Sequence, residues 1–109
     1  MFKRLLDYND GEELEIVVLI KNSQLRHTKN DKLYLALIFG DSSGEIRGNY
    51  WDANNQDAAT FNTGTIVELN GKREEYHGRP QIKIYSLRFV GPQEGYDLNQ
   101  FIKSAPEKN

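Results

Sequence analysis

The side chains that suggest chemistry gather near the middle of the chain, in residues 44–52. Arg47, Asn49 and Trp51 occupy every second position there, while Tyr50 falls on the opposite parity. Because successive side chains of a β-strand point to opposite faces, the first three share one face and Tyr50 belongs to the core. A cation, an amide and an aromatic ring can hold phosphates, base edges and stacked bases. This face is therefore the first candidate for a binding surface.

Further aromatic and basic residues fall where they would extend that surface. The predicted nucleic-acid-binding residues are Arg26, Lys29, Tyr34, Arg47, Asn49, Trp51, Lys72, Tyr76, His77, Arg79, Lys83 and Tyr85. Two alternatives stay open within this set. In the first, Trp51 is a rim residue packed on the short helix instead of a stacking platform. In the second, Tyr34 is an ordinary cross-strand partner instead of a ligand contact.

No residue pattern in the chain predicts catalysis or a resident metal. Ser42 and Ser43 belong to turn chemistry and have no histidine nearby in sequence to act as a base. The acidic run at residues 7–15 lacks the ligand spacing of a calcium loop, and His27 and His77 lie in separate loops. We expect no catalytic residue, no metal site and no cofactor in this chain.

Alternation of apolar residues predicts the elements that must position these side chains. We expect strands at residues 14–25, 33–39, 46–51, 65–73 and 81–90, with tight turns at 41–44 and 75–80. One or two helical turns are expected within 52–61, with Asp52 as the N-cap. Gly71 falls on the inner face of its strand, where a missing side chain permits a bend or a close approach.

The order of these elements predicts an all-β fold. Five strands with one short helix between the third and fourth are typical of the OB-fold, a five-stranded Greek-key barrel. An SH3-like barrel is the main rival, and it usually lacks that helix. In OB-folds the outer face of strands two and three, with its flanking loops, binds oligonucleotides or oligosaccharides. Those loops would be residues 26–31 and 76–79, which are both basic.

The first strand is apolar on both faces, because Val17 and Leu19 alternate with Ile16 and Val18. Such a strand needs cover on both sides. The apolar lead-in before residue 9, the C-terminal tail or another part of the protein would supply it. If Val17 and Leu19 were joined by Tyr34 and Ile38, these residues would form a protein-interaction surface, which is the main alternative function.

Composition limits the class of protein. The chain has 109 residues, 28% charged and 38% hydrophobic, with a net charge of −2 and no cysteine. This predicts one globular domain at residues 1–92 and a tail or linker at 93–109. We expect a cytoplasmic protein without a signal peptide or membrane helix. The basic residues gather in two clusters, so local charge favours a nucleic-acid partner despite the acidic total.

Two stretches carry a resemblance to a known family. DSSGEIRGNYWDA, followed by NTGTIVELNGKREEYHGRPQIKI, is similar to OB domains of the tRNA-anticodon-binding superfamily. From the lead-in to DLNQFIKSAP, the chain resembles the N-terminal part of the YhaM family of 3′–5′ exoribonucleases, also described as cmp-binding factors.

The resemblance implies a division of labour. In that family an OB domain precedes an HD domain, which holds divalent metals such as manganese or magnesium and performs the hydrolysis. Neither histidine of this chain has an adjacent aspartate, so the metal chemistry would belong to the HD domain. The expected function is binding single-stranded RNA or DNA for that domain. A plasmid-replication-enhancer DNA-binding factor is a further alternative, and self-association stays open.

Overall fold

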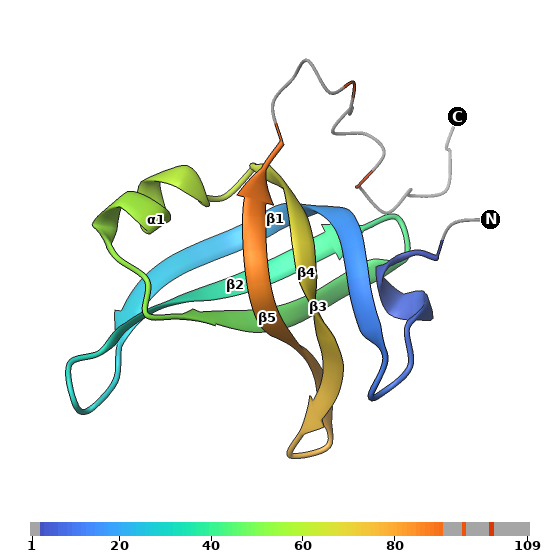
Figure 1. Ribbon diagram of the computed structural model, residues 1–109, viewed down its shortest axis with the longest axis horizontal. Helices are drawn as coiled ribbons and strands as arrows, with labels where there is room; N and C mark the ends of the chain where they lie inside the picture. Colours follow the sequence, from blue (N-terminus) through green and yellow to red (C-terminus); the bar gives the residue numbers. More distant parts are fainter. Residues whose placement is uncertain (1–2, 91–94, 96–100, 102–109) are drawn as a thin grey trace, which may run out of the picture.

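A computed structural model describes residues 3–90, 95 and 101. Its elements run in the order expected for a small β-barrel (Figure 1). They are η1 (Leu5–Asp7), β1 (Glu13–His27), β2 (Leu33–Asp41), β3 (Gly44–Trp51), α1 (Asn55–Thr60), β4 (Ile66–Tyr76) and β5 (Arg79–Phe89). The predicted five strands, with one helix between the third and fourth, are confirmed.

The five strands close into a barrel in the order β1-β2-β3-β5-β4, with β4 returning to β1. All neighbouring pairs are antiparallel except β3 and β5, which are parallel. The β1–β2 loop and the tip of the β4–β5 hairpin both project from the lower side of the barrel in Figure 1. Helix α1 connects β3 to β4 and lies on the upper side in the same view.

The core consists of the inward side chains that the sequence alternation predicts. On β2, Leu35, Leu37 and Phe39 are almost completely buried, while the residues between them are half-buried. Tyr50 packs against the core, and its ring meets Phe61 edge to face at 5.9 Å between centroids. Burying these side chains removes apolar surface from water, which is the main stabilising term of a barrel this small.

Strand β1 carries an extra residue that the sequence alternation did not predict. Ile20 pairs with Phe39, and Asn22 pairs with the next residue, Ile38, so Lys21 forms a bulge. A bulge reverses the parity of all residues after it. Asn22 therefore points outward with Ile38. In an unbroken strand it would share the face of the buried Ile20, two residues before it.

Helix α1 begins later than predicted. The N-cap is Asn54, whose side chain accepts a hydrogen bond of 2.8 Å from the Asp57 backbone N–H. The side chain of Asp57 accepts in return from the Asn54 N–H, which completes a capping box. The prediction of Asp52 as the cap was wrong: its φ of 61° is left-handed, whereas an N-cap is extended.

Strand β5 lies unusually close to β4 at Gly71. A Cβ atom on Gly71 would lie 2.4 Å from the carbonyl oxygen of Lys83, so only glycine fits there. The pairing of the two strands shifts just beyond this point, with Tyr85 as the extra residue between Ile84 and Ser86. The close approach predicted at Gly71 is confirmed.

We predict that Gly71→Ala lowers the free energy of unfolding by about 1–3 kcal/mol or more, because the new methyl group must displace backbone. Urea denaturation followed by circular dichroism measures this change. Gly64→Ala is the matched control, because its Cβ would meet no atom within 4 Å and the left-handed φ of 93° is its only strain. A smaller loss for Gly71→Ala than for Gly64→Ala would contradict the prediction.

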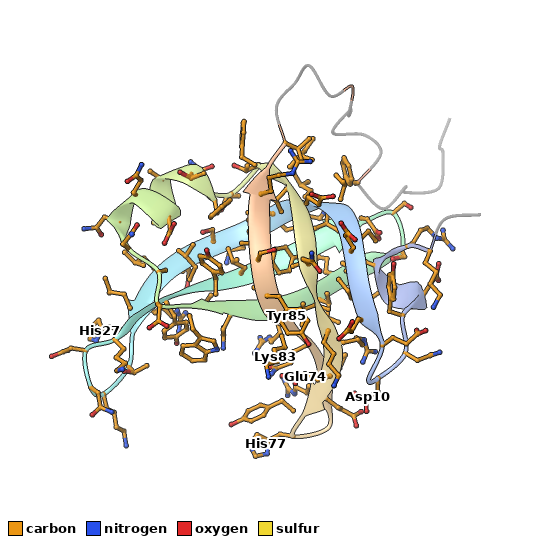
Figure 2. The ribbon with its side chains drawn as sticks, in the orientation of Figure 1. Asp10, His27, Glu74, His77, Lys83 and Tyr85 are labelled. Atoms are coloured by element: carbon orange, nitrogen blue, oxygen red, sulfur yellow. The ribbon has the colours of Figure 1, made fainter. Side chains whose placement is uncertain are left out.

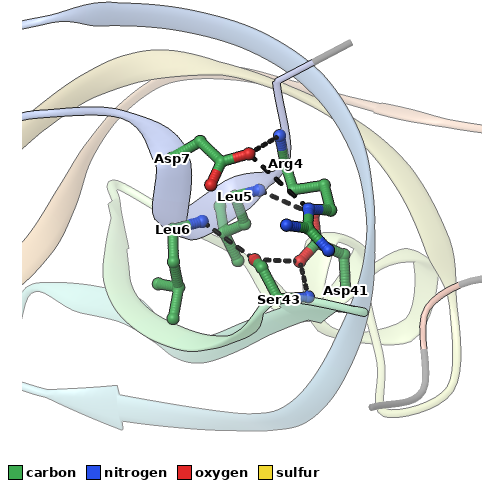
Figure 3. A network of polar contacts seen from close by, with 6 residues as sticks. All are labelled: Arg4, Leu5, Leu6, Asp7, Asp41 and Ser43. Carbon is green, nitrogen blue, oxygen red and sulfur yellow. Dashed lines mark hydrogen bonds and ion pairs between the residues drawn. The ribbon is translucent and has the colours of Figure 1, made fainter. Parts of the chain in front are cut away.

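The lead-in is tied to the β2–β3 turn by a buried carboxylate (Figure 3). Asp41 is 6% exposed, and its Oδ2 accepts from the Leu5 backbone N–H at 2.6 Å. Its Oδ1 accepts from the Ser43 N–H at 2.8 Å and from the Ser43 hydroxyl at 2.5 Å. Ser43 Oγ accepts in turn from the Leu6 N–H at 3.0 Å. These bonds hold Leu5, which is fully buried, in the core.

Two exposed carboxylates also fasten the lead-in. The backbone N–H of Arg4 lowers the pKa of Asp7, and a hydrogen bond from Lys3 lowers the pKa of Glu12, helped by the Asn9 N–H. A lowered pKa in the folded state means that these contacts stabilise the fold at neutral pH. That contribution is lost as the pH falls through the lowered values, below the ordinary 3.8 and 4.5.

Removing the buried carboxylate should loosen this attachment. We predict that Asp41→Ala costs about 1–3 kcal/mol, because the buried N–H of Leu5 is left without an acceptor. The comparison is Asp10→Ala, which removes an exposed carboxylate that makes no hydrogen bond to the other described residues. Equal denaturation midpoints for the two variants would show that the network contributes nothing.

The outer face of β1 is partly covered by Phe101. The predicted tail at residues 93–109 lies outside the described residues except for Gly95 and Phe101. Phe101 is 5% exposed and lines a hollow of about 490 Å³ together with Val17, Tyr8 and Lys3. Leu19 is already buried at 7% exposure. The cover that the sequence required therefore includes residues of the lead-in and Phe101.

Candidate nucleic-acid interface

The outer face of the barrel is organised in rows, because directly paired residues point to the same side of a sheet. Three rows cross it from β1 toward β4. The first holds Arg26, Tyr34 and Trp51; the second holds Gln24, Ala36, Asn49, Lys83 and Lys72; the third holds Asn22, Ile38, Arg47, Gln81 and Glu74. We call these the Trp51, Asn49 and Arg47 rows.

A groove of about 300 Å³ crosses this face. Its lining comes from β1, β2, β3, the end of β4 and the start of β5. The lining residues are Asn22, Gln24, Arg26, Tyr34, Ala36, Leu37, Ile38, Arg47, Asn49, Tyr76 and Gln81. Five of the residues predicted from the sequence are therefore brought together: Arg26, Tyr34, Arg47, Asn49 and Tyr76.

Two aromatic rings stand at the end of the groove nearest α1. Trp51 is 56% exposed, and its ring lies 4.8 Å from that of Tyr34 between centroids, tilted by 36°. Tyr34 is therefore a cross-strand partner, and its partner is Trp51. Tyr34 supports one side of the indole ring, and the indole remains more than half open to solvent.

Two glutamines in the groove have orientations dictated by charge. Gln24 Oε1 accepts from Arg26 Nε at 3.1 Å and from Nη2 at 2.6 Å, so its amide NH₂ group is directed elsewhere. Gln81 donates from Nε2 to Glu74 at 2.9 Å, which leaves its Oε1 as the unused acceptor. A guanidinium can only donate and a carboxylate only accept, so neither amide can turn over without losing its bond.

The other predicted residues surround the groove without lining it. Lys83 and Tyr85 lie on the outer face of the β4–β5 hairpin, with His77 at its tip (Figure 2). The His77 ring meets Tyr76 edge to face at 4.2 Å. Lys72 is paired with Lys83 on that hairpin, Arg79 lies at the start of β5, and Lys29 is exposed in the β1–β2 loop.

Sequence reasoning missed four polar residues of this face: Asn22, Gln24, Gln81 and Glu74. The first two were hidden by the Lys21 bulge, because unbroken alternation assigns their even positions to the core. Asn22, Gln24 and Arg26 are polar at every second position, and this pattern was a signal that the even positions face outward after the bulge. Gln81 lies beside the predicted Lys83 in sequence, but its bond to Glu74 depends on strand pairing.

No group of three or more histidine or acidic side chains among the described residues is arranged to hold a metal ion. His27, at the end of β1, and His77, at the tip of the β4–β5 hairpin, stand apart in Figure 2. Within residues 3–90, 95 and 101, no helix is long and apolar enough to cross a membrane. The arrangement of the face suits binding, by stacking, hydrogen bonding and charge.

The chain is similar in sequence to several curated exoribonucleases. No protein-family model matches the chain. A 3′–5′ exoribonuclease YhaM of Listeria innocua is 39% identical over 106 residues, which are 97% of this chain and 34% of the relative. The enzyme of the same name from Halalkalibacterium halodurans is also 39% identical and is covered to 33%, and that of Bacillus licheniformis is 35% identical.

The chain is homologous to the YhaM exoribonucleases. The resemblance seen in the sequence is thereby confirmed, and it extends over nearly the whole chain. The chain spans about a third of the length of these YhaM relatives, so their catalysis and substrates do not transfer to it directly.

Solved structures confirm the fold class. The second OB-fold domain of replication protein A from Methanococcus maripaludis matches 83% of this chain with a TM-score of 0.60 and 17% identity. A replication protein A heterotrimer bound to single-stranded DNA matches 77% of the chain with a TM-score of 0.57 and 20% identity. The barrel is an OB-fold, as predicted.

The contact between Tyr34 and Trp51 should be measurable on its own. We predict a coupling energy of about 0.5–1.5 kcal/mol in a double-mutant cycle of Tyr34→Leu and Trp51→Leu, because the rings pack against each other beyond simple burial. Urea denaturation of the four proteins gives the value. A coupling near zero would mean that Tyr34 does not support the indole.

Proposed function

We propose that this OB-fold barrel binds single-stranded RNA or DNA along its outer groove. In the YhaM proteins it would hold the substrate strand for a separate metal-dependent catalytic domain. The observation that carries the proposal is the placement of Arg47, Asn49 and Trp51 on one open face. An exposed ring, a cation and an amide are there within reach of one chain of nucleotides.

The energetics of single-strand binding suit these groups. Each base stacked on an aromatic side chain contributes roughly 1–3 kcal/mol. Trp51 offers one open face for such stacking, and Tyr76, 60% exposed, offers a second ring at the other end of the groove. Arg47 has no ion-pair partner among the described residues, so it is available to a phosphate or a base.

The proposed division of labour follows from the lengths of the relatives. They are named 3′–5′ exoribonucleases, and this chain matches about a third of each. The described residues of this third gather no metal-ligand group. We therefore assign hydrolysis, and the manganese or magnesium that the family resemblance implies, to the remaining two thirds. That catalytic portion is the proposed protein partner.

The assembly alternative receives less support from the structure. Its four residues do not form one surface: Tyr34 and Ile38 line the groove, whereas Val17 lines the separate hollow beside Phe101. Leu19 is already buried within the chain. A partner protein would have to contact two distinct regions to use all four.

Fluorescence anisotropy with labelled oligo-U and oligo-dT tests the proposal. We expect Arg47→Ala/Trp51→Ala to weaken binding at least tenfold, because it removes a stacking platform and a cation together. Binding of the wild type should fall steeply as salt rises, since each phosphate contact releases counterions.

The matched control is Arg88→Ala/Phe89→Ala, which removes a cation and an aromatic ring that is 51% exposed from the end of β5. It should bind like the wild type. Equal losses in both double variants would refute the assignment of the groove. Absence of wild-type binding at low salt would refute the function proposed for the isolated barrel.

A further inference from the structure

Charge changes sharply along the Asn49 row. Gln24, Ala36 and Asn49 are uncharged. Two lysines follow, Lys83 on β5 and Lys72 on β4, and the row then closes on Glu13 of β1. Directly opposed like charges repel each other on a sheet. No ion pair joins either lysine to a carboxylate within residues 3–90, 95 and 101. An anion between the two ammonium groups would relieve the repulsion.

The neighbouring Arg47 row has the opposite character at the same place. Its β4 position is Glu74, whose Oε2 accepts from Gln81 Nε2 and whose charge is not paired with a cation in the described chain. Figure 2 shows Glu74 and Lys83 near each other on the hairpin. A phosphate is thus attracted to one row and repelled from the next.

On the β1–β2 side of the groove the same two rows offer no charge. Asn22, Gln24, Ala36 and Ile38 line it, which are amides and apolar groups. The Arg26 bond orients the Gln24 amide so that its remaining N–H groups face away from the guanidinium. Amides and apolar surface suit base edges and base faces better than they suit phosphates.

We propose that Lys72 and Lys83 form a phosphate-binding position, that Glu74 excludes phosphate from the adjacent row, and that the bases lie toward β1 and β2. This inference rests on the proposed function and adds to it the side on which the sugar–phosphate backbone runs. It also gives a role to Lys72, which lies outside the groove lining.

Salt titrations of oligo-dT binding test the phosphate position. For single strands the slope of log affinity against log salt is about −0.7 for each phosphate neutralised. Lys72→Ala and Lys83→Ala should each reduce the slope by roughly that amount and weaken binding severalfold at low salt. Lys3→Ala, the matched control, removes a lysine that lines the separate hollow and should leave the slope unchanged.

Two further variants separate phosphate contacts from base contacts. Glu74→Gln should bind oligo-dT more tightly than the wild type, because it removes a repulsive charge while keeping an acceptor for Gln81. Gln24→Ala should weaken oligo-dT binding at an unchanged salt slope. An abasic oligonucleotide of the same length should respond to the lysine variants but not to Gln24→Ala.

The outcomes are distinguishable from failure of the proposed function. If the wild type binds no oligonucleotide, the function itself fails. If it binds and the slopes of the lysine variants equal that of Lys3→Ala, the phosphate position is wrong. The phosphate position would also be overturned if the abasic oligonucleotide did not bind at the lowest salt. Weaker binding of oligo-dT by Glu74→Gln than by the wild type would overturn it as well. The melting temperature of Lys83→Ala should not fall, because its directly paired neighbours are Asn49 and the like-charged Lys72.

Discussion

The barrel depends on how closely β5 can lie between β3 and β4. A Cβ at Gly48 would lie 3.0 Å from the carbonyl oxygen of Ile82, and one at Gly71 would lie 2.4 Å from that of Lys83. Gly48 on β3 and Gly71 on β4 therefore lie on opposite sides of Ile82 and Lys83 in β5. Larger side chains at these points would hold the strands apart, and the parallel pairing of β3 with β5 that closes the barrel would be lost.

This closure also creates the face that we assign to binding. The parallel register sets Arg47 beside Gln81 and Asn49 beside Lys83, although more than thirty positions separate each pair in the chain. β4 then adds Glu74 and Lys72 to the same rows. The chemistry of the groove thus belongs to no single motif. It arises because Gly48 and Gly71 let β5 lie close to both β3 and β4. The close packing brings the outward residues of these three strands into common rows.

The sequence predicted the local order of the fold well and the pairings between distant strands less well. Alternation in β2 and β3 identified the core side chains Leu35 and Leu37 and the outward Arg47, because their environment repeats every two residues. Bulges break that repeat without a distinctive residue type, which is why Asn22 and Gln24 were not recognised as residues of the outer face. The cap of α1 was misplaced because Asp52 and Asn54 are both good capping residues and only backbone geometry separates them.

The bulge at Lys21 determines which mutations of β1 the barrel can tolerate. Substitutions along β1 alter one side chain at a time, but loss of one residue there would exchange the two faces of everything from Asn22 to His27. Asn22 and Gln24 would turn to the inner face of the sheet, and Leu25, already 36% exposed, would turn to the outer face. The first half of the strand, which pairs with β4, would be unaffected. The barrel can therefore tolerate variation in the identity of residue 21 far better than variation in the length of β1.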